Sequence, residues 1–245
     1  MIKLAAGGSA IRAMFEEGKR LADEFGPENV FDFSIGNPYF APPDAVKDAI
    51  VDIITNDDPM TVHGYPANAG FPAVRKAVAD SLNRRFGTDY NENNIIMTVG
   101  AAGGLNVILR VLCNPGDEVI VISPYFFEYN NYIGNADAKV VVVPAAAENG
   151  FMPDIDAIAA AVTPKTKAII LNNPNNPTGV IYPADMLKKL GELLEAKGKE
   201  YGTVIYLISD EPYRELAYDG AEVPWLPNCC KNTIVGYSWS KSLSL

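Results

Sequence analysis

A lysine set among serines stands out in the sequence. Lys241 lies in the stretch SWSKS, directly after the apolar run TIVGY. A lysine whose pKa is lowered by burial or by a nearby cation becomes a nucleophile that can form a Schiff base with an aldehyde. Ser238 and Ser240 offer hydroxyl groups that could bind an anion beside this amine. Most lysines are simply solvated charges, so the other polar segments of the chain decide how Lys241 is interpreted.

An acidic turn follows another apolar run. Asp210, Glu211, Pro212 and Tyr213 come directly after TVIYLIS. An aspartate in this position either caps a following helix or is a partly desolvated carboxylate that needs a cation as its partner. A cap alone accounts poorly for the tyrosine three residues later.

A loop rich in side-chain amides follows the run KAIIL. Its sequence, NNPNNPTG, occupies residues 172–179. The prolines fix the backbone angle φ and remove hydrogen-bond donors, which makes the loop stiff. Such a loop can be purely structural, or its amides can hold a hydrogen bond on a planar ligand.

A turn of small residues, GAAGG at residues 100–104, follows the run IIMTV and opens a predicted helix. The N–H groups and the positive dipole end of a helix start suit a phosphate, although such turns also occur for packing alone. The turn is neither GxGxxG nor GxxxxGK[ST], which argues against dinucleotide and Walker-type nucleotide sites. Phosphate donors, a lysine, a carboxylate and an amide together describe the handling of pyridoxal phosphate.

These four segments need a scaffold that brings them together. From residue 95 onward, short apolar runs alternate with helical patterns; the runs are NIIMTV, DEVIVIS, KVVVVP, KAIIL, TVIYLIS and NTIVGYS. Helices are predicted at about 11–25, 44–54, 70–87, 101–112, 154–161 and 183–199. This alternation predicts an α/β sandwich with a mostly parallel sheet, in which functional residues lie at the carboxyl ends of the strands.

The motifs NNPNNPTG, SDEPYRELAYDG and SWSKSLSL, in this order and spacing, resemble those of class I/II pyridoxal-phosphate-dependent aminotransferases of fold type I. The resemblance runs from FSIGNPYFAPP to Leu245. It implies an N-terminal arm and part of a small domain in residues 1–45, and a three-layer α/β/α large domain in residues 46–245 that binds the cofactor and is incomplete at its C-terminus. The C-terminal part of the small domain would be absent.

The resemblance implies transfer of an amino group between an L-amino acid and a 2-oxo acid, through a Schiff base of pyridoxal 5'-phosphate with Lys241. Lys241 matches the lysine that holds the cofactor and moves a proton to and from the substrate α-carbon. Asp210 matches the acid that pairs with the pyridine nitrogen and keeps it protonated, which makes the ring an electron sink. Asn176 and Tyr213 match the pair that hydrogen-bonds the ring's phenolic oxygen.

The remaining cofactor contacts follow in the same way. The aromatic residue that stacks on the ring matches Phe126, with Tyr125 as the neighbouring alternative. The resemblance assigns the phosphate to backbone N–H groups and serine hydroxyls of Gly100, Ala101, Ala102, Ser238 and Ser240. Ala101 and Ala102 are often polar in relatives, so this phosphate cup relies more on its backbone donors.

Two further positions concern the substrate and a second subunit. Gly36 resembles a glycine near the substrate carboxylate, and Tyr65 resembles a tyrosine that reaches the phosphate of the partner subunit, which implies a homodimer with shared active sites. The family's two arginines that clamp the phosphate and the substrate carboxylate would lie beyond Leu245. A carbon–sulfur β-lyase of the same fold and a non-catalytic, truncated remnant that binds the cofactor weakly or not at all therefore stay open as alternatives.

Composition limits the partners. The chain has 245 residues and a formal net charge of −10, which disfavours nucleic acid and anionic membranes. With no signal-like start and no long apolar stretch, a cytoplasmic protein is expected. Cys229 and Cys230 are adjacent and Cys113 makes the count odd, so reduced thiols are predicted rather than bridges. His63 is the single histidine, so the cysteines have few further metal ligands to combine with, and no metal is expected.

Overall fold

The computed structural model describes residues 10–33, 36, 38 and 40–245. The chain divides into two compact units, Met1–Ala41 and Pro42–Leu245. The first unit contains the predicted helix, α2 (Ala10–Phe25), followed by the short 3-10 helix η1 (Pro27–Asn29). The stretch FDFSIG, at residues 31–36, lies partly outside the described residues, and its residues 31–33 are not in a strand.

The second unit is built on a sheet of five parallel strands in the order β2-β1-β3-β4-β5. The strands are β1 (Glu118–Ser123), β2 (Lys139–Pro144), β3 (Thr166–Asn172), β4 (Tyr206–Asp210) and β5 (Thr233–Gly236). Each of them coincides with an apolar run of the sequence. The predicted α/β fold with a parallel sheet is therefore confirmed.

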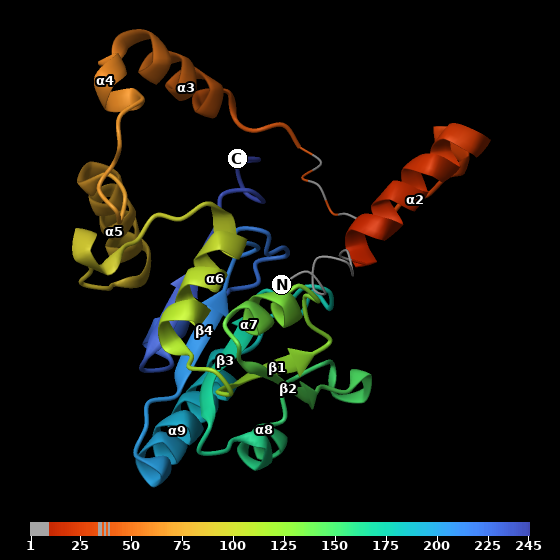
Figure 1. The fold of residues 1–245 in the computed structure, drawn as a ribbon, viewed down its shortest axis with the longest axis vertical. Coiled ribbons are helices and arrows are strands. Elements are labelled where there is room, and N and C mark those ends of the chain that lie inside the picture. Colours follow the sequence, from red (N-terminus) through yellow and green to blue (C-terminus); the bar gives the residue numbers. More distant parts are fainter. Residues whose placement is uncertain (1–9, 34–35, 37, 39) are drawn as a thin grey trace. The chain divides into compact units, whose positions relative to one another are not determined.

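Helices cover both faces of this sheet because successive strand residues point to opposite sides. On one face, side chains such as Ile169 and Leu207 pack with Leu187 of α9 (Ala184–Tyr201) and Ile158 of α8 (Ile155–Ala161). On the other face, Ile170 and its neighbours pack with α6 (Gly100–Leu112) and α7 (Tyr129–Asn135). Figure 1 shows these helices around the strands. The arrangement is the expected three-layer sandwich.

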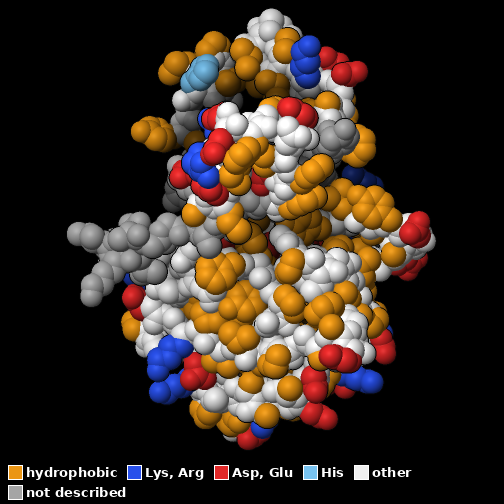
Figure 2. Space-filling model, turned by 90° about the vertical axis from the view of Figure 1, so that its right-hand side faces the viewer, with side chains coloured by type: hydrophobic (Ala, Val, Ile, Leu, Met, Phe, Trp, Pro, Cys, Tyr) orange, Lys and Arg blue, Asp and Glu red, His pale blue; other side chains and the backbone are white. Residues whose placement is uncertain are grey.

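The segment before the sandwich is helical. It comprises α3 (Asp44–Asn56), α4 (Pro59–Val62), α5 (Pro72–Phe86) and the 3-10 helix η2 (Glu92–Asn94), while η3 (Ala147–Asn149) and η4 (Leu226–Asn228) lie further along the chain. Helix α5 ends at Gly87, whose φ of 66° is the left-handed conformation that favours glycine. Helices α3 and α4 bury none of their residues. Figure 2 shows one face of the molecule, where many apolar side chains, in orange, reach the surface.

One predicted strand is wrong. The run NIIMTV, at residues 94–99, forms no strand. Met97 donates one backbone hydrogen bond to Ala69, but Ile96 and Val99 remain exposed. The physical reason is that a strand exists only through a pairing partner. Residues 94–98 instead line a groove of about 570 Å³ that is also lined by Thr233, Ile234 and Val235 of β5.

No described helix is long and apolar enough to cross a membrane.

Candidate functional site

The ends of three strands meet at one edge of the sheet. Asn172, the last residue of β3, is in register with Asp210 at the end of β4, which is in register with Gly236 at the end of β5. The amide-rich loop, the acidic turn and the lysine turn therefore all leave the sheet at neighbouring points. This is the carboxyl edge, where parallel sheets place their ligands.

Asp210 is a buried carboxylate, only 5% exposed. Its Oδ2 accepts a hydrogen bond of 2.5 Å from the hydroxyl of Tyr129, while its Oδ1 is buried without a hydrogen-bond partner among the described residues. Burial raises the pKa of Asp210 to about 6, the Tyr129 hydrogen bond opposes this rise, and the charge of Glu211 adds to it. Of the two interpretations left open by the sequence, the structure favours the desolvated carboxylate, because residues 211–216 form no helix to cap.

The amide-rich loop has one part that stabilises itself and another that faces the acidic turn. Asn173 accepts a hydrogen bond from the backbone of Tyr182, and Asn175 accepts from the hydroxyl of Thr178, so both have structural roles. Asn176, in contrast, points toward the acidic turn.

Asn176 and Tyr213, predicted to act as a pair, lie side by side. The amide Nδ2 of Asn176 donates to the hydroxyl oxygen of Tyr213 at 2.9 Å. Because Tyr213 accepts this bond through a lone pair, its hydroxyl proton can still be donated to a ligand. Asn172 holds the pair in place: its Oδ1 accepts from the backbone N–H of Asn176 at 2.5 Å, and its Nδ2 donates to the backbone oxygen of Asp210 at 2.8 Å.

The lysine turn follows β5 directly. Ser238 is 7% exposed, and its Oγ lies 2.7 Å from the Oγ of Ser240 and accepts a hydrogen bond from the Ser240 backbone N–H. Lys241 is half-buried in the same turn, which is closed by a hydrogen bond from Leu243 N–H to Trp239 oxygen. Two hydroxyls and an amine thus share one turn, as the sequence predicts.

The turn of small residues starts α6, as expected. Gly100 has a φ of 67°, a conformation that favours glycine, and no heavy atom would lie within 4 Å of a Cβ at this position. The first N–H groups of the helix have no acceptor within the helix itself. Ala101 is half-buried and Ala102 is exposed. Helix α6 also contacts β5, which ends just before the lysine turn.

Phe126 and Tyr125 both lie against Tyr129, which connects them to Asp210. The ring of Phe126 meets that of Tyr129 edge-to-face, with centroids 5.7 Å apart, whereas Tyr125 is nearly parallel to Tyr129 at 6.3 Å. The hydroxyl of Tyr125 donates to Asn130 Oδ1. Phe126 therefore has the more purely apolar surroundings of the two candidates.

Two other predicted residues, Tyr65 and Gly36, were assigned to the partner subunit and to the substrate. Tyr65 is fully exposed in the loop after α4. Gly36 belongs to the first unit, so its place near the site stays a prediction. His63, which sequence reasoning assigned no role, ends α4 by donating its backbone N–H to Pro59. The three cysteines carry no disulfide, and the described residues contain no group of three or more acidic, histidine or cysteine side chains that could hold a metal ion.

Sequence reasoning missed Tyr129 and the bridging role of Asn172. Tyr129 lies 81 residues before Asp210, and nothing in its local pattern distinguishes it from the other aromatic residues of SPYFFEYNNY. Burial and the charge of Asp210 raise the pKa of Tyr129, so it remains a hydrogen-bond donor. For Asn172, the signal was its position directly after the apolar run KAIIL.

Comparison with known proteins agrees with this geometry. The family model described as "Aminotransferase class I and II" matches residues 28–245. The chain is 33% identical to an aspartate aminotransferase of Pyrococcus horikoshii over 238 residues, which is 97% of this chain and 57% of that protein.

Solved structures give the same result. An amino transferase from Eubacterium rectale is 46% identical with a TM-score of 0.96, covering 100% of this chain and 62% of its own. An aspartate aminotransferase from Thermus thermophilus, solved with maleate, is 31% identical with a TM-score of 0.83, covering 99% of this chain and 61% of its own. The chain thus spans about 60% of the length of these relatives.

Proposed function

The chain belongs to aminotransferase class I and II, and from this premise we propose that it binds pyridoxal 5'-phosphate and moves an amino group between an L-amino acid and a 2-oxo acid. One observation carries the proposal: the buried Oδ1 of Asp210, which lacks a hydrogen-bond partner among the described residues, at the carboxyl edge of the sheet. An orphaned buried carboxylate oxygen is costly unless a cationic donor reaches it. A protonated pyridine nitrogen is such a donor.

The residues around Asp210 suit the rest of the ring, and we call Asp210, Asn176 and Tyr213 the ring end of the site. The hydroxyl of Tyr213, held by Asn176 at 2.9 Å, can donate to the phenolic oxygen. Phe126 offers an apolar face for stacking, and its edge-to-face contact with Tyr129 would hold its orientation. The pKa of about 6 for Asp210 would fall when a pyridinium lies beside it, because an opposite charge favours the ionised carboxylate.

The start of α6 and the lysine turn suit the phosphate, and together they form the phosphate end. Its members are Gly100, Ala101, Ala102, Ser238 and Ser240. A helix start provides N–H donors and a positive dipole end. The open space around Gly100 allows an anion to approach the backbone. The paired hydroxyls of Ser238 and Ser240, 2.7 Å apart, can turn their protons toward a phosphate oxygen.

Lys241 is proposed as the catalytic lysine. Pyridoxal phosphate would supply an aldehyde for attachment to the lysine amine and an electron-withdrawing ring that stabilises negative charge on the substrate α-carbon. The amine of Lys241, once displaced by the substrate amine, would take the proton from the substrate α-carbon and deliver it to the C4′ carbon of the cofactor. Asp210 and Tyr213 would assist by fixing the charge and orientation of the ring.

The remaining features are proposals that depend on the family. The first is a homodimer with shared sites, in which Tyr65 reaches the partner's phosphate and Gly36 lies near the substrate carboxylate. The second is a division at residue 45 between an N-terminal arm and the cofactor domain. The third is a cytoplasmic location. The exposure of Tyr65 is compatible with a role across a subunit contact. Because the chain spans only part of its relatives' length, activity of the 245-residue chain is itself part of the proposal.

The test begins with cofactor binding. Purified protein is mixed with pyridoxal phosphate and reduced with borohydride, and peptides are analysed by mass spectrometry. A phosphopyridoxyl adduct is expected on Lys241, and Lys241→Ala should lose it. An unmodified Lys241, or an equal adduct spread over surface lysines, contradicts the proposal.

Substrate assays then separate the reactions open to this fold. Amino transfer that requires a 2-oxo acid supports the aminotransferase. Release of pyruvate and ammonia identifies a β-lyase. An adduct on Lys241 without turnover of any amino acid would mean that this chain is a non-catalytic cofactor-binding fragment.

A further inference from the structure

A buried ion pair lies directly behind the ring end and is not used by the proposed chemistry. Arg214 Nε donates to Glu211 Oε2 at 2.5 Å, and Glu211 is 0% exposed. The other carboxylate oxygen, Oε1, accepts from the hydroxyl of Ser209 at 2.6 Å. Burying a charged pair often stabilises a fold no more than apolar side chains would. Stability alone therefore does not explain why the fold buries these two residues.

The guanidinium of Arg214 is fixed on every side. Its two terminal nitrogens donate to the backbone oxygens of Val223 at 2.9 Å and Pro224 at 2.8 Å. Its central carbon lies 5.1 Å from the ring centroids of both Phe86 and Trp225, which stack on each other at 4.4 Å. A planar fork bound in this way has little freedom, and it ties the acidic turn to α5 and to residues 223–225.

Glu211 and Arg214, the two residues of the ion pair, each directly follow a residue of the ring end in the sequence. Along the chain, Asp210 precedes Glu211, and Tyr213 precedes Arg214. Side chains of neighbouring strand residues point to opposite faces; accordingly Ser209 bonds Glu211, whereas Asp210 turns toward Tyr129. The backbone of Glu211 is also held, since its N–H donates to Gly236 oxygen at 2.8 Å. Because Glu211 and Arg214 are fixed, the backbone of the turn is fixed, and this determines where the side chains of Asp210 and Tyr213 point.

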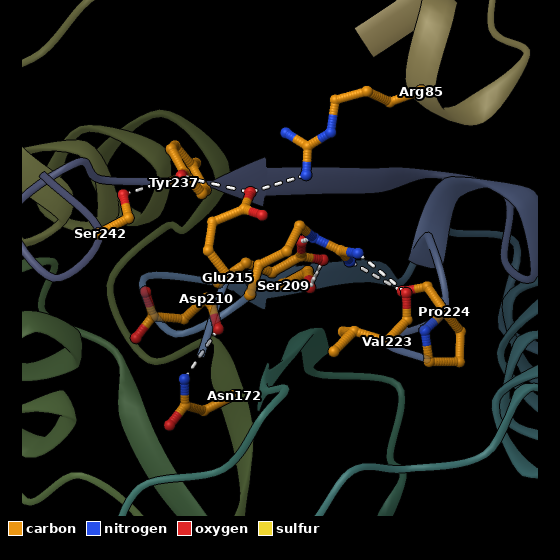
Figure 3. Close-up of polar contacts among 11 residues, drawn as sticks. Arg85, Asn172, Ser209, Asp210, Glu215, Val223, Pro224, Tyr237 and Ser242 are labelled. Carbon is orange, nitrogen blue, oxygen red and sulfur yellow. Dashed lines mark hydrogen bonds and ion pairs between the residues drawn. The ribbon is translucent and has the colours of Figure 1, made fainter. Parts of the chain in front are cut away.

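A second contact connects the same turn to the lysine turn. Glu215 forms an ion pair of 2.6 Å with Arg85 of α5 and accepts a long hydrogen bond of 3.5 Å from the Tyr237 hydroxyl. That hydroxyl lies 3.2 Å from the Oγ of Ser242, the residue after Lys241. Figure 3 shows this path from Arg85 to Ser242. The ring end and the lysine turn are therefore anchored to one network.

We propose that Glu211 and Arg214 are positioning residues of the cofactor site, which hold Asp210 and Tyr213 at the spacing that a pyridine nitrogen and a phenolic oxygen require. The inference rests on the proposed function, because it concerns the same cofactor. Neither residue touches the cofactor in this proposal. Both act through the backbone of the turn, so their effect is on cofactor affinity and on the protonation of the bound ring rather than on any bond that is made or broken.

The test replaces the pair by apolar residues of similar volume, Glu211→Met with Arg214→Met. Such a replacement commonly preserves folding, so it separates a positioning role from a structural one. Cofactor dissociation constants are measured by visible absorbance and unfolding by urea. The matched control is Lys76→Gln with Asp80→Asn, which removes an exposed ion pair of 2.6 Å on α5.

A positioning role predicts that the double Met variant unfolds cooperatively, yet binds pyridoxal phosphate about ten- to hundredfold more weakly, because misplacement of catalytic groups by about 1 Å has effects of that size. The pH at which the visible absorbance of the bound cofactor changes should also rise, since Tyr213 would no longer favour the ionised phenolic oxygen. The control should match the wild type in both measurements.

Equal affinity and an equal pH profile in the double Met variant and the wild type would overturn the inference. If the double Met variant does not fold, Glu211→Gln decides, because it keeps the volume of Glu211 but offers one acceptor oxygen to the two donors, Ser209 and Arg214. Its affinity should fall at least threefold relative to the control, and an unchanged value overturns the inference. A wild-type protein that binds no cofactor refutes the proposed function and this inference with it, whereas cofactor-binding variants that equal the wild type refute the inference alone.

Discussion

The ring end and the phosphate end of the candidate site are held in opposite ways. At the ring end, Asp210 is 5% exposed, and Tyr129, Asn172 and the Glu211–Arg214 pair support it from several directions. At the phosphate end, Gly100 and Ala102 are exposed, and Val99 just before them is 95% exposed. The ring end is part of the core, whereas the phosphate end combines the buried Ser238 with a surface turn that faces the groove along β5.

This difference indicates how each end would bind. The ring end offers charged and hydroxyl side chains already fixed by hydrogen bonds, so each substitution there should disturb folding and binding together. The phosphate end offers mainly backbone N–H groups, which no side-chain substitution removes. Folding energy is therefore expected to depend on the ring end, whereas the phosphate end should tolerate change.

The largest expected effect tests this contrast on stability. Arg214→Ala leaves the carboxylate of Glu211 buried without its cation, which should lower the free energy of unfolding by about 3–5 kcal/mol. Ser240→Ala at the phosphate end removes one half-buried hydrogen bond and should cost about 1 kcal/mol. Urea denaturation of both variants measures the difference. Equal losses would remove the contrast between the two ends.

The next effect concerns pH and the cofactor-free protein. The pKa of Asp210 is raised from 3.8 to about 6 by burial, so between these values the folded state binds more protons than the unfolded state. The contribution of Asp210 to stability is thus most favourable below pH 3.8 and is lost as pH rises through 6. This loss lowers the free energy of unfolding by about 3 kcal/mol.

Asp210→Asn isolates this contribution. The free energy of unfolding is measured by denaturation at pH 4 and pH 7 for the wild type and the variant. The change between the two pH values is then compared between the two proteins, so that the contributions of all other titrating groups cancel. The wild type should lose about 3 kcal/mol more than the variant between the two pH values. Parallel pH profiles would mean that the carboxylate is not desolvated.

The smallest effect sharpens the role of Tyr129. In Tyr129→Phe the Oδ2 of Asp210 loses its donor, at a cost of about 1–3 kcal/mol. Because the hydrogen bond from Tyr129 lowers the pKa of Asp210, its removal should move the loss of stability to higher pH than in the wild type. The same denaturation series measures this. A shift to lower pH would contradict the assigned hydrogen bond.

The sequence predicts those parts of the molecule that local pattern determines. Apolar runs identified the five strands, and the position of Asn176, Asp210 and Ser238 at or after strand ends was enough to expect them at one edge. The structure has Asp210 at that edge, Asn176 beside Tyr213 of the acidic turn, and Ser238 two residues after the end of β5.

The rest depends on contacts between distant residues. Residues 94–99 have the composition of a strand and no described strand to pair with. Tyr129 reaches Asp210 only because α7 packs on the same face of the sheet as the side chain of Asp210. Arg214 meets Phe86 and Trp225 through folding of the whole unit. No local sequence pattern predicts such contacts, because they depend on how distant elements pack together rather than on the periodicity of one segment.

The groove along β5 has a consequence for handling the purified chain. Strand β5 is the last in the sheet order, so one row of its backbone N–H and C=O groups faces the groove instead of another described strand. Its sequence, TIVG, is apolar and β-branched, and an open edge of this kind is a template for strand addition by a second molecule. Sedimentation at increasing concentration should therefore reveal self-association, and a charged residue at Ile234 should suppress it.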